Sequence, residues 1–324
     1  MKDFLKPVFA GWLLATAAMV GAQDLAEHHK KGSPVKVIFE TDMCTDVDDV
    51  GALATLHALA DLNEVEILAI GYNEVHKNGG AAISAINTWY NRGDLPIGVY
   101  KKDLHMPDVS GYLDQTAKFP NAMSGAPVEF PSAVDIYLKT LSAQPDSSVT
   151  IISVGFLNNL RDLLDTHPDL IAQKVQKLVI MGGLHNDVWN LVRHELVKTS
   201  ERIFEDWPTP IIISEPGADI HTGQDLAHTS PENPVRASYY HYFDQTFKGR
   251  SSWDQIAVLF GVRGLKYFSL HADGVGRLPS GYAIHMRPAW RSYIRTKLSN
   301  PAYERLINDL MSKPPAGLEF IREK

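Results

Sequence analysis

Four carboxylates lie close together in the stretch KVIFETDMCTDVDDVGAL, which covers residues 36–53. Like charges this close repel one another and raise each other's pKa, so a cation is expected among them unless all four face water. Oxygen ligands with no histidine nearby favour Ca²⁺ or Mg²⁺ over Zn²⁺. The four acids are Asp42, Asp46, Asp48 and Asp49.

The sequence around these acids predicts a buried strand at 36–40 and a helix from Asp49 onward. Similar apolar strands alternate with helical patterns along the chain, which indicates parallel pairing with right-handed crossovers. Runs such as VTIISV and KLVIM are apolar at consecutive positions, as strands covered on both faces require. The predicted strands are 36–40, 65–71, 95–99, 148–154, 177–182 and 210–214, and the helices between them are 49–62, 79–91, 132–143, 157–166 and 195–205.

The chain after about residue 232 has helical patterns at 233–247, 251–262 and 299–312, which predict a helical C-terminal cap. The expected fold is therefore α/β, with a mostly parallel sheet covered by helices on both faces. In such a sheet ligands bind at the carboxyl ends of strands, where the acidic turn, Val154 and Gly182 all fall.

The composition fits a globular protein that binds a small ligand. The chain has 324 residues, of which 44% are hydrophobic, and a formal net charge of -7 with dispersed Lys and Arg, so nucleic-acid binding is not expected. Cys44 is the only cysteine, which excludes an intrachain disulfide. The composition leaves homo-oligomer formation open.

The first 22 residues have the layout of a secretory signal peptide, with Lys2 and Lys6 before the apolar run VFAGWLLATAAMVGA. We expect cleavage near Ala22, no stable membrane span after cleavage, and a secreted or periplasmic protein. Residues 23–35 are expected to form a flexible lead-in, and residues 36–324 one domain.

Three local interpretations of the acidic turn follow from the residues alone. A calcium-binding EF-hand loop starting at Asp46 fails, because Val50 and His57 stand where oxygen ligands belong. A phosphatase with an aspartate nucleophile two residues before a second aspartate is a weak alternative, because Glu40 precedes Asp42. Helix capping would account for one or two of the acids but not for four.

A fourth interpretation comes from resemblance. The stretch FETDMCTDVDDVGALA resembles the N-terminal signature of the inosine-uridine-preferring nucleoside hydrolases, in the longer DxxxDxDD form. Later segments resemble other family motifs in the same order: SVGFLNNLRDLL, KLVIMGG, WPTPIIISEPG and GRSSWDQIAVL. The resemblance spans residues 36 to about 263. It implies the family's mostly parallel fold and hydrolysis of a ribonucleoside to ribose and free base.

The resemblance also implies a site that holds one Ca²⁺ and a calcium-bound water. Asp42, Asp49 and Asp254 match the carboxylate ligands, Val154 matches a carbonyl ligand, and Asp42 also matches the base that takes the proton of the water. The sugar contacts match Asp48 and Asn190, with Asn186 as a looser candidate and Trp189 as a surface for the base. Asp46 has no counterpart in the shorter motif, and we expect it to support the turn.

Some positions depart from the family pattern. Val188 stands where a glutamate usually meets the ribose 5′-hydroxyl, unless Asp187 replaces it, and Trp253 stands where some members have a histidine. His194 replaces a frequent aspartate, and we expect it to be an ordinary loop histidine. These departures keep a second hypothesis open, in which the chain is a non-catalytic, calcium-dependent protein that binds a sugar or nucleoside. Asp254 could also be a helix N-cap.

Overall fold

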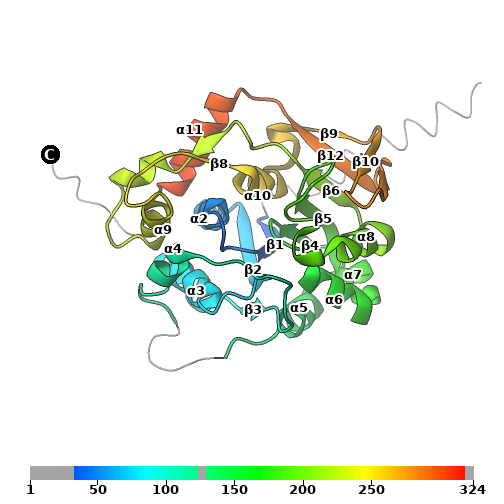
Figure 1. The fold of residues 1–324 in the computed structure, drawn as a ribbon, viewed down its shortest axis with the longest axis horizontal. Coiled ribbons are helices and arrows are strands. Elements are labelled where there is room, and N and C mark those ends of the chain that lie inside the picture. Colours follow the sequence, from blue (N-terminus) through cyan, green and yellow to red (C-terminus); the bar gives the residue numbers. More distant parts are fainter. Residues whose placement is uncertain (1–32, 123–128, 318–324) are drawn as a thin grey trace, which may run out of the picture.

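The computed structural model describes residues 33–122 and 129–317 (Figure 1). The predicted signal peptide and residues 23–32 of the predicted lead-in lie outside the described residues. In the described part of the chain, no helix is both long and apolar enough to cross a membrane.

An eight-stranded sheet forms the centre of the molecule (Figure 1). All neighbouring strands in it are parallel except the last pair, β12 and β9. This arrangement confirms the predicted mostly parallel sheet. In spatial order the strands are β3 (Ile97–Val99), β2 (Val65–Tyr72), β1 (Val35–Thr41), β4 (Val149–Ser153), β5 (Val175–Met181), β6 (Ile211–Ser214), β12 (Arg291–Thr296) and β9 (Phe268–His271).

Helices cover both faces of this sheet, as predicted, and an apolar core lies on each side. One core joins the sheet to α2 (Asp48–Asp61), α3 (Gly79–Trp89), α10 (Trp253–Arg263) and α11 (Asn300–Met311). The opposite core joins it to α5 (Ala133–Ser142), α6 (Asn158–Thr166), α7 (Pro168–Lys174) and α8 (Val197–Asp206). Neighbouring residues of β1 belong to different cores, Ile38 to one and Phe39 to the other, because side chains alternate along a strand.

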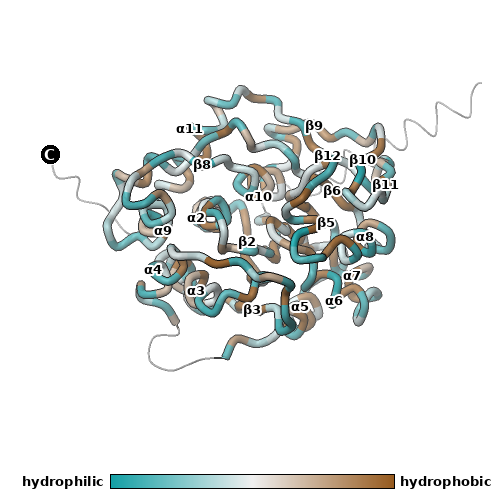
Figure 2. The backbone as a smooth tube through the Cα atoms, viewed as in Figure 1, coloured by the Kyte–Doolittle hydropathy of each residue, from teal (hydrophilic) through white to brown (hydrophobic). Residues whose placement is uncertain are grey.

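The buried strands have the apolar runs that two covered faces require. Every residue of β4 is buried, and brown, hydrophobic segments run through the central strands while the outer loops are mostly teal (Figure 2). The apolar runs in the sequence therefore located these strands correctly.

The C-terminal part contains the predicted helical cap, formed by α9 (Pro234–Tyr242), α10 and α11, but it also contributes strands that were not predicted. β9 and β12 extend the main sheet, and β10 (Val275–Arg277) pairs with β11 (Ala283–His285) in a small antiparallel sheet. These strands are only three to six residues long. Segments this short carry too little periodicity to be separated from loops.

Candidate active site

The acidic turn lies at the carboxyl end of β1, between that strand and α2. β4 pairs with β1 in parallel, so Val154, which follows β4, lies at the same edge of the sheet. The main chain there is packed against the turn, since a Cβ on Gly155 would lie 2.4 Å from the backbone nitrogen of Asp42. Only glycine permits this approach.

Asp254 reaches the same place from a distant part of the chain. It is buried in the first turn of α10, a helix that packs against α2. The N-cap position of α10 belongs to Ser252, two residues before Asp254, so Asp254 is not the N-cap of this helix. Ser252 makes no side-chain cap hydrogen bond. Val47 likewise precedes α2 without a cap hydrogen bond. Capping therefore does not account for the acids at either helix.

A cavity of about 530 Å³ opens over these acids. Its volume falls in the range of about 300–1,000 Å³ that is usual for small-molecule sites. Two of the predicted residues, Asn190 and Trp189, line it together with the acids, whereas Asn186 does not. The residues that line it include Asp42, Asp46, Asp48, Asp49, Val154, Asp187, Trp189, Asn190, Arg193, Tyr242, Arg250, Trp253 and Asp254.

The environment of four of these carboxyl groups disfavours their charged form. Burial raises the pKa of Asp42, Asp48, Asp49 and Asp254 well above the usual value, and the negative charges of neighbouring aspartates raise each of them further. A bound cation would relieve both effects, because it stabilises the ionised carboxylates.

The oxygen atoms of the site fit such a cation. Asp48 Oδ1 and Asp254 Oδ1 are buried and accept no hydrogen bond from the described residues. Asp49 Oδ1 accepts a hydrogen bond from Thr41, which fixes that carboxylate. Carboxylates and one main-chain carbonyl, with no nitrogen or sulfur ligand, form the donor set that hard cations prefer.

Asp46 has a different environment from the other three acids of the turn. Arg250 Nη2 donates a hydrogen bond of 2.7 Å to Asp46 Oδ2, and Arg250 Nε lies 3.8 Å from Asp48 Oδ1. The hydroxyl of Tyr112 donates to the main-chain oxygen of Asp46, at 2.6 Å. Asp46 is thus ion-paired beside the cavity, as a residue that supports the turn would be.

Asn190 lies directly beside the predicted carbonyl ligand. It is buried, and its side-chain amide donates a hydrogen bond to the main-chain oxygen of Val154. Asn186 instead adopts a positive φ of 55°, and its backbone N–H bonds to Arg277 on the small sheet. Of the two asparagines proposed to contact the sugar, only Asn190 faces the cavity.

Asp187 organises the loop before Asn190. Its Oδ2 accepts the N–H of Gly183 at 2.6 Å, and its Oδ1 accepts the N–H groups of Trp189 and Leu191 at 2.8 and 3.3 Å. Val188 is exposed. The carboxylate of Asp187 is thus engaged by the main chain.

Two arginine–aromatic pairs that were not predicted line the cavity. The guanidinium of Arg193 lies 4.5 Å from the ring centroid of Trp189, which is 57% exposed. That of Arg250 lies 5.1 Å from the ring of Trp253. Both rings offer flat surfaces against which a nucleobase could stack. Each arginine is close to its ring along the chain, Arg193 four residues after Trp189 and Arg250 three residues before Trp253, but no motif drew attention to either arginine.

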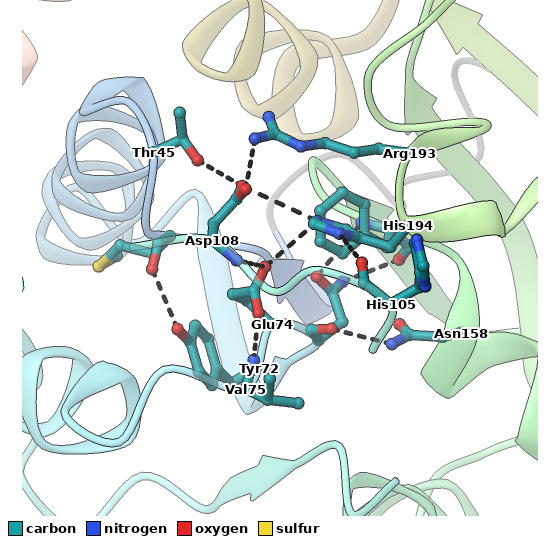
Figure 3. A network of polar contacts seen from close by, with 12 residues as sticks. Thr45, Tyr72, Glu74, Val75, His105, Asp108, Asn158, Arg193 and His194 are labelled. Atoms are coloured by element: carbon teal, nitrogen blue, oxygen red, sulfur yellow. Dashed lines mark hydrogen bonds and ion pairs between the residues drawn. The ribbon is translucent and has the colours of Figure 1, made fainter. Parts of the chain in front are cut away.

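His194 is not the ordinary loop histidine that was expected; that prediction is wrong. Its side chain is only 2% exposed and packs edge-on against Phe156, with ring centroids 4.8 Å apart. Its Nε2 lies 3.4 Å from Glu74 Oε2 and 3.8 Å from Asp108 Oδ2 (Figure 3). Glu74 and Asp108 lie in segments where no motif drew attention to them.

Comparison with known proteins shows which family the chain resembles. Residues 37–195 match the model of the family described as inosine-uridine preferring nucleoside hydrolase. A protein of Schizosaccharomyces pombe, described only as uncharacterized, is 27% identical over 167 residues. That match covers 48% of this chain and about half, 51%, of the yeast protein.

Solved structures with the same fold include an inosine-uridine preferring nucleoside hydrolase from Bacillus anthracis. It has a TM-score of 0.64 and 16% identity, over 86% of this chain and 99% of that chain. The type III effector protein XopQ, solved in complex with adenosine diphosphate ribose, has a TM-score of 0.62 and 11% identity, over 95% of this chain and 99% of its own. Identities this low establish the fold alone.

The matched segment contains the acidic turn, Val154 and Asn190, and the fold agrees with that of nucleoside hydrolases over most of the chain. The chain thus resembles the inosine-uridine preferring nucleoside hydrolase family, as the sequence motifs predicted, and that family is metal-dependent.

Proposed function

We propose that this chain hydrolyses the N-glycosidic bond of a ribonucleoside to give ribose and free base, with Ca²⁺ as its cofactor. One observation carries the proposal: carboxylates from two distant segments, the acidic turn and Asp254, line one cavity beside the carbonyl of Val154. Purine or pyrimidine salvage is the role that such an activity would serve.

The residues of the cavity have distinct roles in this proposal. Asp42, Asp49, Asp254 and the carbonyl of Val154 would hold the calcium, and a bound divalent cation lowers the pKa of a coordinated water and orients it. Asp42 would accept the proton of the attacking water. Asp48 and Asn190 would bind ribose hydroxyls, and Trp189 would stack against the base.

The charge of the site suits this reaction. Cleavage of an N-glycosidic bond develops positive, oxocarbenium-like charge on the sugar, which nearby carboxylates stabilise. Asp48 is placed for this, since it lines the cavity and is buried. A positively charged cavity of the same shape would oppose the same transition state.

A second candidate is a non-catalytic protein that binds a nucleoside or a ribose-like ligand through the same calcium site. The loop before Asn190 favours it, because Val188 is exposed and the carboxylate of Asp187 accepts three main-chain N–H groups. The main chain of the loop thus holds the carboxylate of Asp187, and Val188 offers no polar side chain to the ribose 5′-hydroxyl. The fold itself is compatible with ligand binding, as the neighbour solved with adenosine diphosphate ribose illustrates.

The phosphatase alternative has less support. It places the nucleophile at the position of Glu40, which is fully buried, does not line the cavity and accepts hydrogen bonds from Asn73, Asn159 and Tyr137. Burial raises the pKa of Glu40 to about 8, so the carboxyl is largely protonated at neutral pH and a poor nucleophile.

A substrate panel separates the three functions. Purine and pyrimidine ribonucleosides, 2′-deoxynucleosides and p-nitrophenyl phosphate would be incubated with the protein and Ca²⁺, and ribose, base and phosphate release measured. The proposal requires ribose and base from at least one ribonucleoside. Calcium-dependent thermal stabilisation without any cleavage would favour the binding protein, and turnover of p-nitrophenyl phosphate alone would favour the phosphatase.

We also propose that the chain is exported, on the basis of the N-terminal segment Met1–Ala22. Mass spectrometry of the mature protein tests this, since the proposal requires a new N-terminus close to Gln23. An intact Met1 on the mature protein would contradict export by cleavage.

A further inference from the structure

A second cluster of potential metal ligands lies beside the candidate active site (Figure 3). Glu74 follows β2, Asp108 lies in the segment before α4 (Gly111–Thr116), and His194 follows Asn190. One ligand atom from each residue lies within 4.8 Å of the other two. None of the three lines the cavity or belongs to the calcium site proposed above.

The orientation of His194 is the observation that points to a ligand. Its Nδ1 lies 2.8 Å from the main-chain oxygen of His105, and a carbonyl can only accept, so Nδ1 carries the proton. In the neutral ring Nε2 then has a free lone pair. This nitrogen is buried and makes no hydrogen bond with any described residue, yet it faces Glu74 Oε2 at 3.4 Å and Asp108 Oδ2 at 3.8 Å.

Hydrogen bonds to other residues fix the positions of the Glu74 and Asp108 carboxylates. Glu74 Oε1 accepts the N–H of Val75 at 2.6 Å, and Oε2 has only a long contact of 3.4 Å with the N–H of Asp108. Asp108 Oδ1 accepts from Arg193, and Oδ2 accepts from Thr45. An oxygen that accepts one hydrogen bond keeps a second lone pair. Each ligand is thus fixed through a further contact, as is usual around protein metal sites.

We propose that Glu74, Asp108 and His194 form a second metal site, which binds Zn²⁺ or a similar first-row divalent ion such as Mn²⁺. Metal–ligand bonds of about 2.0–2.2 Å in a tetrahedral site separate the ligand atoms by roughly 3.3–3.6 Å. The 3.4 and 3.8 Å separations at Nε2 are close to these values. An imidazole nitrogen in the set favours these ions over Ca²⁺.

The site would join segments that shape one wall of the cavity. Thr45 belongs to the acidic turn, and Arg193 lies over the ring of Trp189, so both partners of Asp108 line the cavity. A metal bound at Asp108 would therefore fix the position of the Trp189–Arg193 pair. Its role is structural, and it does not depend on whether the cavity catalyses hydrolysis.

The first test uses the full-length protein, stripped of metal with a chelator and then saturated with Ca²⁺ to occupy the acidic turn. Titration with Co²⁺ should then give the visible absorption bands of a low-symmetry site with one nitrogen ligand, and these bands should saturate at one equivalent of Co²⁺. Added Zn²⁺ should displace the Co²⁺ and remove the bands. No band and no tight Zn²⁺ or Mn²⁺ binding under these conditions would overturn the proposal and leave His194 as the partner of two acids in an ion pair.

Variants assign the binding to the cluster. His194→Ala and Glu74→Gln should each weaken Zn²⁺ affinity by at least about 100-fold, more than the loss of an outer contact causes, while the Ca²⁺-dependent rise in Tm persists. The matched control is His185→Ala, which removes an exposed histidine nine positions earlier. Persistence of the Ca²⁺ response shows that the variants fold. Equal Zn²⁺ affinity in His194→Ala, Glu74→Gln and wild type would place the ion elsewhere and refute the site.

Discussion

Arg250 and Asp46 form an ion pair of 2.7 Å across 204 positions of the chain. Arg250 lies in β8 (Arg250–Ser251), four residues before Asp254, so the pair connects the acidic turn to the segment that supplies the remote carboxylate. This ion pair also gives Asp46 a different role from Asp42 and Asp49, because Asp46 is neutralised by an arginine while Asp42 and Asp49 are not.

This difference predicts how substitutions in the turn affect calcium binding. Asp42→Ala and Asp49→Ala should abolish the Ca²⁺-dependent rise in Tm, because each removes a ligand. Asp46→Ala should only weaken Ca²⁺ affinity, by about tenfold, a typical effect of losing an outer contact. Calorimetric titration of the three variants checks this.

Asp169→Ala, which removes an exposed acid of α7, serves as the control for the general loss of negative charge. Equal Ca²⁺ affinity in the Asp42, Asp46 and Asp49 variants would contradict the assignment of roles within the turn.

Trp189 is predicted to bind the nucleobase. Trp189→Ala should raise KM for a ribonucleoside about tenfold or more with little change in kcat, since aromatic stacking on a base is worth about 1–3 kcal/mol. The matched control is Trp290→Ala, because Trp290 is also exposed and also has an arginine, Arg291, 5.0 Å from its ring centroid. A similar KM for Trp189→Ala and wild type would exclude this role.

Asp187 is predicted to support the loop before Asn190 through hydrogen bonds to the main chain, and not to contact the ribose 5′-hydroxyl of the substrate. Asp187→Ala should lower kcat/KM for inosine and for 5′-deoxyinosine by similar factors, because the loop that carries Asn190 loses three hydrogen bonds. If the variant were impaired with inosine alone, its carboxylate would have to contact the 5′-hydroxyl directly.

Lys177 in β5 is predicted to destabilise the fold at neutral pH. It is buried and forms no ion pair with the described residues, and its Nζ lies 5.9 Å from the centroid of the Phe260 ring. Burial lowers the pKa of Lys177 from 10.5 to about 8. Lys177→Met keeps the apolar stem, so it should raise the free energy of unfolding at pH 7 by roughly 2–3 kcal/mol.

The pH dependence follows from the sign of this shift. Below pH 8 the lysine is charged in both states and the full penalty applies. Between about pH 8 and 10.5 the folded state loses its proton first, so the wild type gains stability and the advantage of Lys177→Met disappears. Urea unfolding at pH 7 and pH 10 measures this, with Lys36→Met as the control because Lys36 is partly exposed and paired with Glu66. An advantage that is equal at both pH values would contradict the explanation.

The sequence was most informative where local pattern determines structure. The apolar runs located β1, β2, β4, β5 and β6, and the spacing of acids at one strand end identified the candidate site. Asp254 was found only through the order of motifs, because nothing in its own neighbourhood marks it as close to the turn. The short strands β9 to β12 were missed because three to six residues carry too little periodicity.

The polar surroundings of the site depend on tertiary packing. Arg250 and Arg193 have no distinctive local pattern, and their ion pairs with Asp46 and Asp108 exist only because the fold brings distant segments together. His194 was misjudged for the same reason, since its burial arises from Phe156 and Glu74, which come from two other segments.

The most direct measurement is ribose release from the ribonucleoside cleaved best in the substrate panel, with and without bound Ca²⁺. We expect chelation to abolish release and added Ca²⁺ to restore it in wild type, whereas Asp254→Asn, which removes one buried ligand charge, is inactive in both conditions. Release that continues unchanged after chelation, or that survives in Asp254→Asn, would contradict the proposed calcium-dependent hydrolysis.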